Sequence, residues 1–232
     1  MVEWPLGRVA IGLILLGCGG QEQAGSKRAE FTCSPVTLPA GELLIDDFED
    51  GNLALAPVGI LHGAWYVNND GTGTQVPSPE DVAPASLIVT DDVGKTRTQA
   101  LHTSGAGFSR WGAFAAARLN GAGAQACSVD LSAHSRLSLR VKGAGSLRAN
   151  LGTQATTPIV DGGECATDAC SDYGASVQLT PEWRALSLRF DELAQPAWAD
   201  PADFDPSTAL RLSFWAEGAD FDFWVDDIRL LP

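Results

Sequence analysis

From Leu43 to the C-terminus, hydrophobic residues alternate with polar ones or form short blocks that end at Gly, Pro, Asn or Asp. This is the two-residue period of half-buried antiparallel strands, and helical periodicity is almost absent. Leu137, Leu139 and Val141, for example, face one side of an expected strand, and the polar residues between them face the other. The pattern predicts strands at 43–48, 63–67, 86–90, 99–105, 111–119, 136–143, 146–153, 174–179, 183–190, 209–217 and 221–231.

The number and spacing of these segments predict the fold class. Many short strands separated by turn-rich gaps are typical of an all-β fold, an antiparallel β-sandwich. Only the stretch after Asp205-Pro206 resembles a helix start, and there the alternation of Leu210 and Leu212 favours a strand. We expect one folded domain over 42–232.

The N-terminal segment carries export signals. An apolar run from Val9 to Gly17 is too short to cross a bilayer and indicates a secretion signal. The run ends in Leu15-Leu16-Gly17-Cys18, which resembles a bacterial lipobox, so Cys18 would become the first mature residue and carry lipids. The alternative is ordinary export, with Cys18 present by chance.

We therefore expect a signal peptide at 1–17 and a lipidated Cys with a flexible polar tether at 18–41. Such a protein is exported, held at the bacterial cell envelope, and in contact with a membrane through its lipid anchor only. Gly19, rather than Asp, after the lipidated Cys favours the outer membrane by analogy with enteric lipoproteins.

The other four cysteines are an even number in a chain expected to reach an oxidising compartment. Cys165 and Cys170 flank a short loop and can close a small ring, which leaves Cys33 to pair with Cys127. The alternative is a metal site, but the spacing is not that of a zinc ribbon and no His lies nearby. We predict two disulfides.

The overall charge limits the classes of partner. Fifteen basic and 29 acidic residues give a net charge of −14. Phosphate binding needs clustered Lys and Arg, which the sequence lacks, so nucleic acid is excluded as a partner. The acidity suits a solubilising surface, or clusters that hold hard cations.

Two acidic clusters lie at the ends of the expected domain. One follows the first hydrophobic run, and the other interrupts the last predicted strand; their members are Asp46, Asp47, Glu49 and Asp50, and Asp222, Asp226 and Asp227. Clusters at both ends of one domain suggest a common role.

The order of several motifs supplies a candidate for that role. The first strand reads "IDDFEDG", later stretches read "LSLRVKG" and "PEWRALSLRFDEL", and the last strand reads "FWVDDIRL". Together they resemble jelly-roll carbohydrate-binding modules, especially those of the family 11 type with a galactose-binding-like fold. The resemblance covers most of 42–232 and implies that the first and last strands end close together.

The resemblance also implies a structural calcium ion, Ca2+, near those strand ends. Calcium binds six to eight oxygens, part of them from carboxylates. The matching candidates are Asp47 and Glu49, with Asp226 or Asp227. The alternation of strand residues does not decide between the last two, because neighbours face opposite sides. The alternative is a turn after Asp50 and an Asp pair that faces solvent.

A carbohydrate-binding module stacks sugar rings on aromatic side chains and pairs their hydroxyls with polar groups. Trp183 and Trp224 suit structural roles. Trp198, in a loop rich in Pro and Asp, is the best exposed candidate, followed by Tyr173 and Trp111. The polar candidates are Arg110, Asn150, Gln154 and Asp172.

No catalytic constellation is evident. His62, His102 and His134 are scattered, and none belongs to a metalloprotease or nucleophile-elbow motif. Three hypotheses remain: a non-catalytic module that binds a polysaccharide or glycan, a structural or assembly lipoprotein with the same fold, and a hydrolase or lyase. We favour the first, as a monomer.

Overall fold

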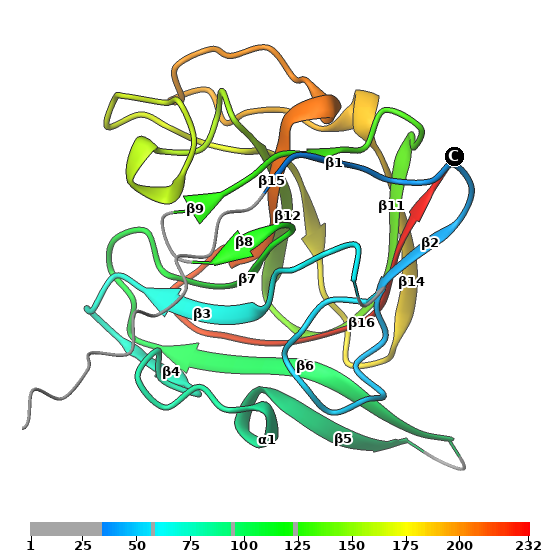
Figure 1. Ribbon diagram of the computed structural model, residues 1–232. Helices are drawn as coiled ribbons and strands as arrows, with labels where there is room; N and C mark the ends of the chain where they lie inside the picture. The colour runs from blue at the N-terminus through cyan, green and yellow to red at the C-terminus, as the bar shows by residue number, and fades with distance from the viewer. Residues whose placement is uncertain (1–33, 57–58, 94–95, 123–124) are drawn as a thin grey trace, which may run out of the picture. The chain divides into compact units, whose positions relative to one another are not determined.

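Two sheets, antiparallel except for one short parallel strand pair, pack face to face (Figure 1). The computed structural model describes residues 34–56, 59–93, 96–122 and 125–232, without the side chains of 92–97 and 122–125. These residues belong to one compact unit, Phe31–Pro232.

Sheet A and sheet B each contain seven strands within the described residues. The strands of sheet A are β1 (Val36–Thr37), β10 (Val129–Asp130), β15 (Ala209–Ala216), β12 (Ser146–Thr153), β13 (Tyr173–Gln178), β7 (Ala113–Arg118) and β3 (Trp65–Asn69). The strands of sheet B are β14 (Arg184–Arg189), β11 (Arg136–Ala144), β16 (Phe221–Leu231), β6 (Thr96–Ala106), β4 (Thr74–Val76), β2 (Leu43–Asp46) and β5 (Ile88–Val93).

The remaining elements are short. They are a hairpin of β8 (Gly121–Ala122) and β9 (Gln125–Ala126), the helix α1 (Pro84–Leu87), and the 3-10 turns η1 (Ile159–Asp161), η2 (Phe190–Glu192) and η3 (Pro206–Thr208). No helix in the described part of the chain is long and apolar enough to span a membrane.

The alternating residues of both sheets form one hydrophobic core. In β11, Leu137, Leu139 and Val141 are buried, and Phe223 and Val225 of β16 lie beside them. Burial of each such side chain contributes about 1.5–3 kcal/mol relative to exposure. The opposite phase of each strand therefore faces outward, which positions the site described below.

All of the predicted strand segments form strands, including 209–217, where the structure confirms a strand rather than a helix. The segment 86–90 enters its strand only at Ile88, because Pro84 begins α1. The sequence reading missed β1, β4, β8, β9 and β10, which have two or three residues each and are too short to show a period.

Strand β1 lies inside the predicted tether of 18–41. Val36 pairs with Val129 of β10, and Leu38 is buried in the core. The folded domain thus begins before residue 42, because two apolar side chains near the tether's end are covered by the sandwich.

Strand β16 brings the two ends of the domain together. It pairs with β11, β6 and β2 (Figure 1), and Ile228 of β16 lies opposite Asp46 of β2. The pairing confirms that the strand predicted at 43–48 and the last strand are neighbours, whereas the shorter β1 lies in the other sheet.

Candidate functional site

The side chains of sheet A that point away from the core form a layer, which we call the sheet A face; Ala116, Ser213 and Asn150 in its middle are buried, and Trp111 at its edge is exposed. Strand register arranges the side chains of this face in rows. The first row contains Asn68, Phe114, Trp215, Arg148 and Ser176; the second contains Tyr66, Ala116, Ser213, Asn150 and Gly174; the third contains Arg118, Arg211 and Gly152. The first and third rows are four positions apart along β15, from Trp215 to Arg211, a span of about 13 Å.

An aromatic cluster occupies one end of this face. The rings of Phe114 and Trp215 stack with centroids 4.7 Å apart, and Trp111 lies 5.4 Å from Trp215. Trp111 is 45% exposed. The carboxylate of Asp70 fixes its loop by accepting hydrogen bonds from the backbone N–H of Arg110 (3.2 Å) and of the residue after Trp111 (2.7 Å). An open indole is therefore held rigidly beside two covered rings.

A charged network occupies the other end. Arg211 donates from Nε to the buried carboxylate of Asp172 at 2.7 Å and from Nη1 to Asp161 at 3.5 Å. Arg118 donates from Nη2 to the same Asp161 at 3.1 Å. Both guanidinium groups are mostly covered. Because each has a carboxylate partner, the network is rigid, and Asp161 is its most exposed member, with 36% of its side chain open to solvent.

Between these ends the face carries further polar groups. Burial raises the pKa of Tyr66 and lowers that of Arg148. Arg148 donates to the carbonyl of Ala194, and Asn150 and Ser213 are buried in the second row. The charges balance, since three arginines face three carboxylates: Arg118, Arg148 and Arg211, and Asp161, Asp172 and Glu217.

Two glycines leave space for the polar side chains of the sheet A face. A Cβ on Gly152 would lie 2.7 Å from Oδ1 of Asp172, and one on Gly174 would lie 2.0 Å from Oδ1 of Asn150. Side chains at these positions would displace the groups that the face presents.

The structure brings together three of the predicted ligand-binding residues and separates the others. Trp111, Asn150 and Asp172 all belong to the sheet A face or its edge. Arg110 is exposed beside Trp111, and Gln154 lies in the loop after β12, where its backbone bonds to Thr208 and Glu164.

Tyr173 and Trp198 do not join this group. Tyr173 points away from the face, because it neighbours Gly174, which faces outward; its hydroxyl donates to the carbonyl of Ala202 at 2.5 Å, and its ring packs on Phe204. Trp198 is 65% exposed in the loop between β14 and β15, in which Asp200 donates its backbone N–H to the carbonyl of Ala169.

The sequence reading missed several residues of the face, which are Tyr66, Phe114, Arg118, Arg148, Asp161, Arg211 and Trp215. For β7 and β15 a signal existed in the phase of alternation. Phe114, Ala116 and Arg118 share one side of β7, as Arg211, Ser213 and Trp215 share one side of β15.

The first acidic cluster is bound into the sandwich. Asp46 is buried and accepts hydrogen bonds from the backbone N–H of Phe48 and from Nε1 of Trp65, both at 2.8 Å. Burial raises the pKa of Asp46 to about 7. Asp47 only accepts the backbone N–H of Glu49, in a turn.

The second cluster is bound to an arginine. Burial raises the pKa of Asp226 to about 6. Its Oδ2 accepts from Thr98 at 3.1 Å and from Arg140 at 3.4 Å, and Arg140 also reaches Asp227 at 3.5 Å. Asp227 has a left-handed backbone, with φ 50°, so both neighbouring carboxylates reach one guanidinium instead of facing opposite sides.

These contacts bear on the predicted calcium site. Oγ1 of Thr98 also lies 2.9 Å from Oε1 of Glu49, so this hydroxyl, which has one proton to donate, lies between the two clusters. Among the described residues, however, no three His, Cys, Asp or Glu side chains gather in a group that could hold a metal. The carboxylates are occupied by hydroxyl, backbone and guanidinium donors, and the positive charge of Arg140 opposes a dication between them. The arrangement does not fit a calcium ion, and the ion stays a prediction.

A second aromatic group lies on the outside of sheet B. Nζ of Lys142 lies 4.5 Å from the ring of Trp224 and 5.3 Å from that of Trp183, and 2.7 Å from Oδ2 of Asp91. Nε1 of Trp183 donates to the same oxygen at 2.7 Å, and His102 stacks on Trp224. Trp183 and Trp224 are occupied by these intramolecular contacts, which suits the structural roles predicted for them.

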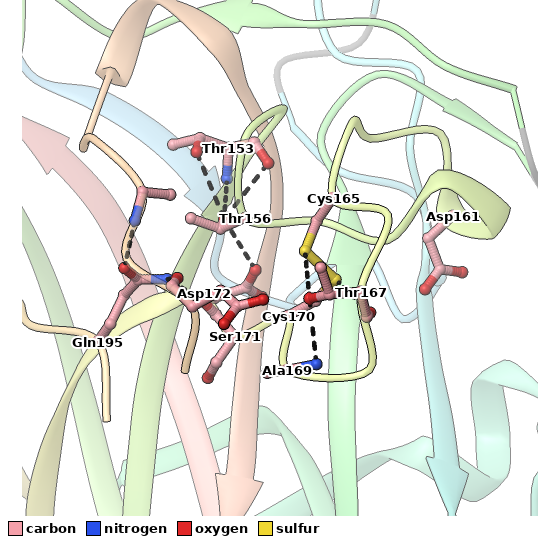
Figure 2. The surroundings of a disulfide bond; sticks show 12 residues. Thr153, Thr156, Asp161, Cys165, Thr167, Ala169, Cys170, Ser171, Asp172 and Gln195 are labelled. Atoms are coloured by element: carbon pink, nitrogen blue, oxygen red, sulfur yellow. Dashed lines mark hydrogen bonds between the residues drawn. A yellow bond between two sulfur atoms is a disulfide. The ribbon is translucent and has the colours of Figure 1, made fainter. Parts of the chain in front are cut away.

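One predicted disulfide is confirmed. Cys165 and Cys170 are bonded, and their ring lies beside Asp172 (Figure 2). Cys127 is also disulfide-bonded. Its predicted partner Cys33 and the predicted lipidation site Cys18 lie outside the described residues, so those two assignments stay predictions.

No family model matches the chain, and no curated protein matches it. Among solved structures, it is similar to a family 30 carbohydrate-binding module, with 15% identity over 82% of this chain and 97% of that one, at a TM-score of 0.50. A family 11 module from Clostridium thermocellum in complex with a beta-1,3-1,4-mixed-linked tetrasaccharide is 18% identical over 84% of this chain and 97% of that one, at 0.47. The family 11 module of the cellulosomal cellulase Lic26A-Cel5E of the same organism is 18% identical over 84% and 96%, at 0.48. The similarity shows the fold: an all-β, two-sheet sandwich of the jelly-roll kind.

Proposed function

We propose that this protein binds a polysaccharide or glycan on the sheet A face, without chemically altering it. The observation that carries the proposal is the open indole of Trp111, held against Trp215 at one end of a face that is otherwise lined by paired polar groups. A pyranose ring has apolar faces that stack on an indole, and its hydroxyls need donors and acceptors at fixed positions.

The charge balance of the face favours binding over catalysis. Asp161 and Asp172 are tied to arginines, and Glu217 accepts hydrogen bonds from Ser146 and Ser176. These carboxylate oxygens already accept hydrogen bonds from guanidinium and hydroxyl groups of the protein, so they are not free to exchange a proton with a ligand.

A titration mapped by NMR tests the proposal. The full chain is titrated with soluble β-glucans, xylans and mannans, and backbone amide shifts are followed in both sheets. We expect saturable shifts that concentrate on β7, β12 and β15. The amides of β11, β14 and β16 are the internal control. No saturable shift with any glycan, or shifts confined to sheet B, would refute the proposal and favour a structural role for the sandwich.

We also propose that this binding takes place at the cell envelope, through lipids on Cys18. The support is the sequence Leu15-Leu16-Gly17-Cys18 after an apolar run. Expression of the full chain in a bacterial host with a labelled fatty acid tests it. The label should enter the native chain and be absent from Cys18→Ser, whereas equal labelling of the two would exclude this anchor.

A further inference from the structure

The charged end of the sheet A face depends on one connection of the sandwich, the loop between β12 and β13. Arg118 and Arg211 come from neighbouring strands and lie opposite each other in the register of β7 and β15. Their carboxylate partners, Asp161 and Asp172, both belong to the β12–β13 loop, 154–172. The sheet supplies the two cations, and a single loop sets their orientation.

The two carboxylates lie in different halves of that loop. Asp161 ends the turn η1, which is held near Cys165: the backbone N–H of Ile159 donates to the carbonyl of Cys165, and that of Cys165 donates to Thr157, both at 3.1 Å. Asp172 lies two residues after Cys170. The disulfide therefore joins the half that carries Asp161 to the half that carries Asp172 (Figure 2).

Few other contacts hold the ring that the disulfide closes. Within it, Ala166, Thr167 and Asp168 are exposed, and none contributes to the hydrophobic core. The contacts on the far side are polar and come from the loop that carries Trp198: the backbone N–H of Asp200 donates to Ala169 at 3.0 Å, and Gln195 donates to the carbonyl of Ser171 at 2.7 Å. The covalent bond and these polar contacts therefore hold the ring together, and only the covalent bond links its two ends directly.

The position of Asp172 leaves little freedom. Its Oδ1 accepts from Thr156 at 3.1 Å, its Oδ2 from Arg211 at 2.7 Å, and it crosses directly above Gly152, where a Cβ would touch it. A shift of the chain at Cys170 would move this carboxylate off Arg211, and the guanidinium would then reorient on the face.

We propose that the disulfide between Cys165 and Cys170 is a positioning element of the binding face, which fixes Asp172 and through it Arg211 in the geometry that a ligand meets. The bond makes no contact with the ligand itself. The consequence for ligand affinity depends on the proposed glycan binding; the effect on Arg211 does not.

The experiment uses the full chain and the double variant Cys165→Ala/Cys170→Ala. The first readout is the exchange of the Arg211 Nε–H with water, followed by NMR and assigned by its loss in Arg211→Lys. A hydrogen bond to a buried carboxylate slows this exchange. We expect faster exchange in the double variant, with little change in Tm, and unchanged exchange in Thr167→Ala, which alters the ring but leaves it closed. Exchange as slow as in the native chain would overturn the proposal.

The second readout is the affinity for whichever glycan the native chain binds. The double variant should bind about tenfold more weakly. Asp172→Asn, nearly isosteric, should also weaken binding, and the combined variant should be no worse than Asp172→Asn alone, because both act through one group. Additive losses would mean that the disulfide does not act through Asp172. A native chain that binds no glycan would refute the proposed function, while the exchange measurement would still decide the role of the disulfide.

Discussion

The ring of Trp111 lies 5.4 Å from that of Trp215, and only the first is widely open to solvent. Trp215 belongs to β15 and is partly covered by Phe114, whereas Trp111 precedes β7 in a loop fixed by Asp70. One covered indole thus supports an exposed one.

We expect Trp111→Ala to weaken glycan binding by about 30-fold, since truncation of an aromatic hot spot typically costs about 2 kcal/mol. Trp111→Phe should retain part of the affinity, because a smaller aromatic ring still stacks. Isothermal titration of the full chain measures both. Trp198→Ala is the matched control: it removes a more exposed indole from another loop, and its affinity should equal that of the native chain. The opposite ranking of the two alanine variants would place the sugar on the loop between β14 and β15.

The period of hydrophobic residues was sufficient to predict the long strands and the sandwich, because burial of one face forces alternation. It was not sufficient for the site. The exposure of Trp198 follows from its local sequence, but the role of Trp111 depends on contact with Trp215, more than a hundred residues away in the chain. The pair of Arg211 and Asp172 is equally non-local, and no period of a single strand encodes it.

The arrangement of the two acidic clusters could also be predicted only in part. The resemblance to carbohydrate-binding modules implied that the strands carrying the two clusters would end close together, and pairing of Ile228 with Asp46 brings them together. The sequence did not reveal Arg140, which lies in an ordinary alternating strand and reaches both Asp226 and Asp227. A cation from the middle of the chain competes for the position that the sequence assigned to calcium.

This competition gives a prediction about stability. Arg140→Met leaves the carboxylate of Asp226 buried without its cation. The loss should lie between the ~0–1 kcal/mol of an exposed ion pair and the ~3–5 kcal/mol of a broken buried one, because the arginine is itself partly exposed. Thermal unfolding should show a lower Tm for the variant. Addition of a calcium chelator should leave the Tm of the native chain unchanged. A chelator-induced fall that added calcium reverses would instead support the predicted ion.

The stability of the native chain should also fall as the pH rises from about 4 to about 7. Asp46 and Asp226 have folded-state pKa values of about 7 and about 6, above the ordinary value of 3.8. In this window the folded state binds more protons than the unfolded state, so the free energy of unfolding decreases with pH. Each of these two carboxyl groups contributes its full share to the free energy of unfolding below its unfolded-state pKa. That share is lost as the pH rises through its folded-state pKa.

Urea unfolding at a series of pH values measures this slope. Asp46→Asn should flatten the part near pH 7 and Asp226→Asn the part near pH 6, even if each variant is less stable overall, because an amide does not titrate in this range. A native stability that rises between pH 5 and 7 would contradict the burial-driven shifts.

The last prediction concerns Lys142, whose ammonium lies between the rings of Trp183 and Trp224 and is paired with Asp91. Both charged side chains are mostly covered, and Asp91 comes from β5, so the pair ties the β5–β6 hairpin to the middle of sheet B. Lys142→Met keeps the aliphatic stem but removes the charge, which should cost about 1–3 kcal/mol through the lost cation–π contacts and the unpaired carboxylate. Urea unfolding measures this loss.

The control is Arg189→Met, which removes the exposed ion pair between Arg189 of β14 and Asp191 of η2 and should leave the free energy of unfolding unchanged. Glycan affinity should be the same in both variants, because these residues lie on the other sheet; a loss of affinity in Lys142→Met alone would place a binding surface on sheet B.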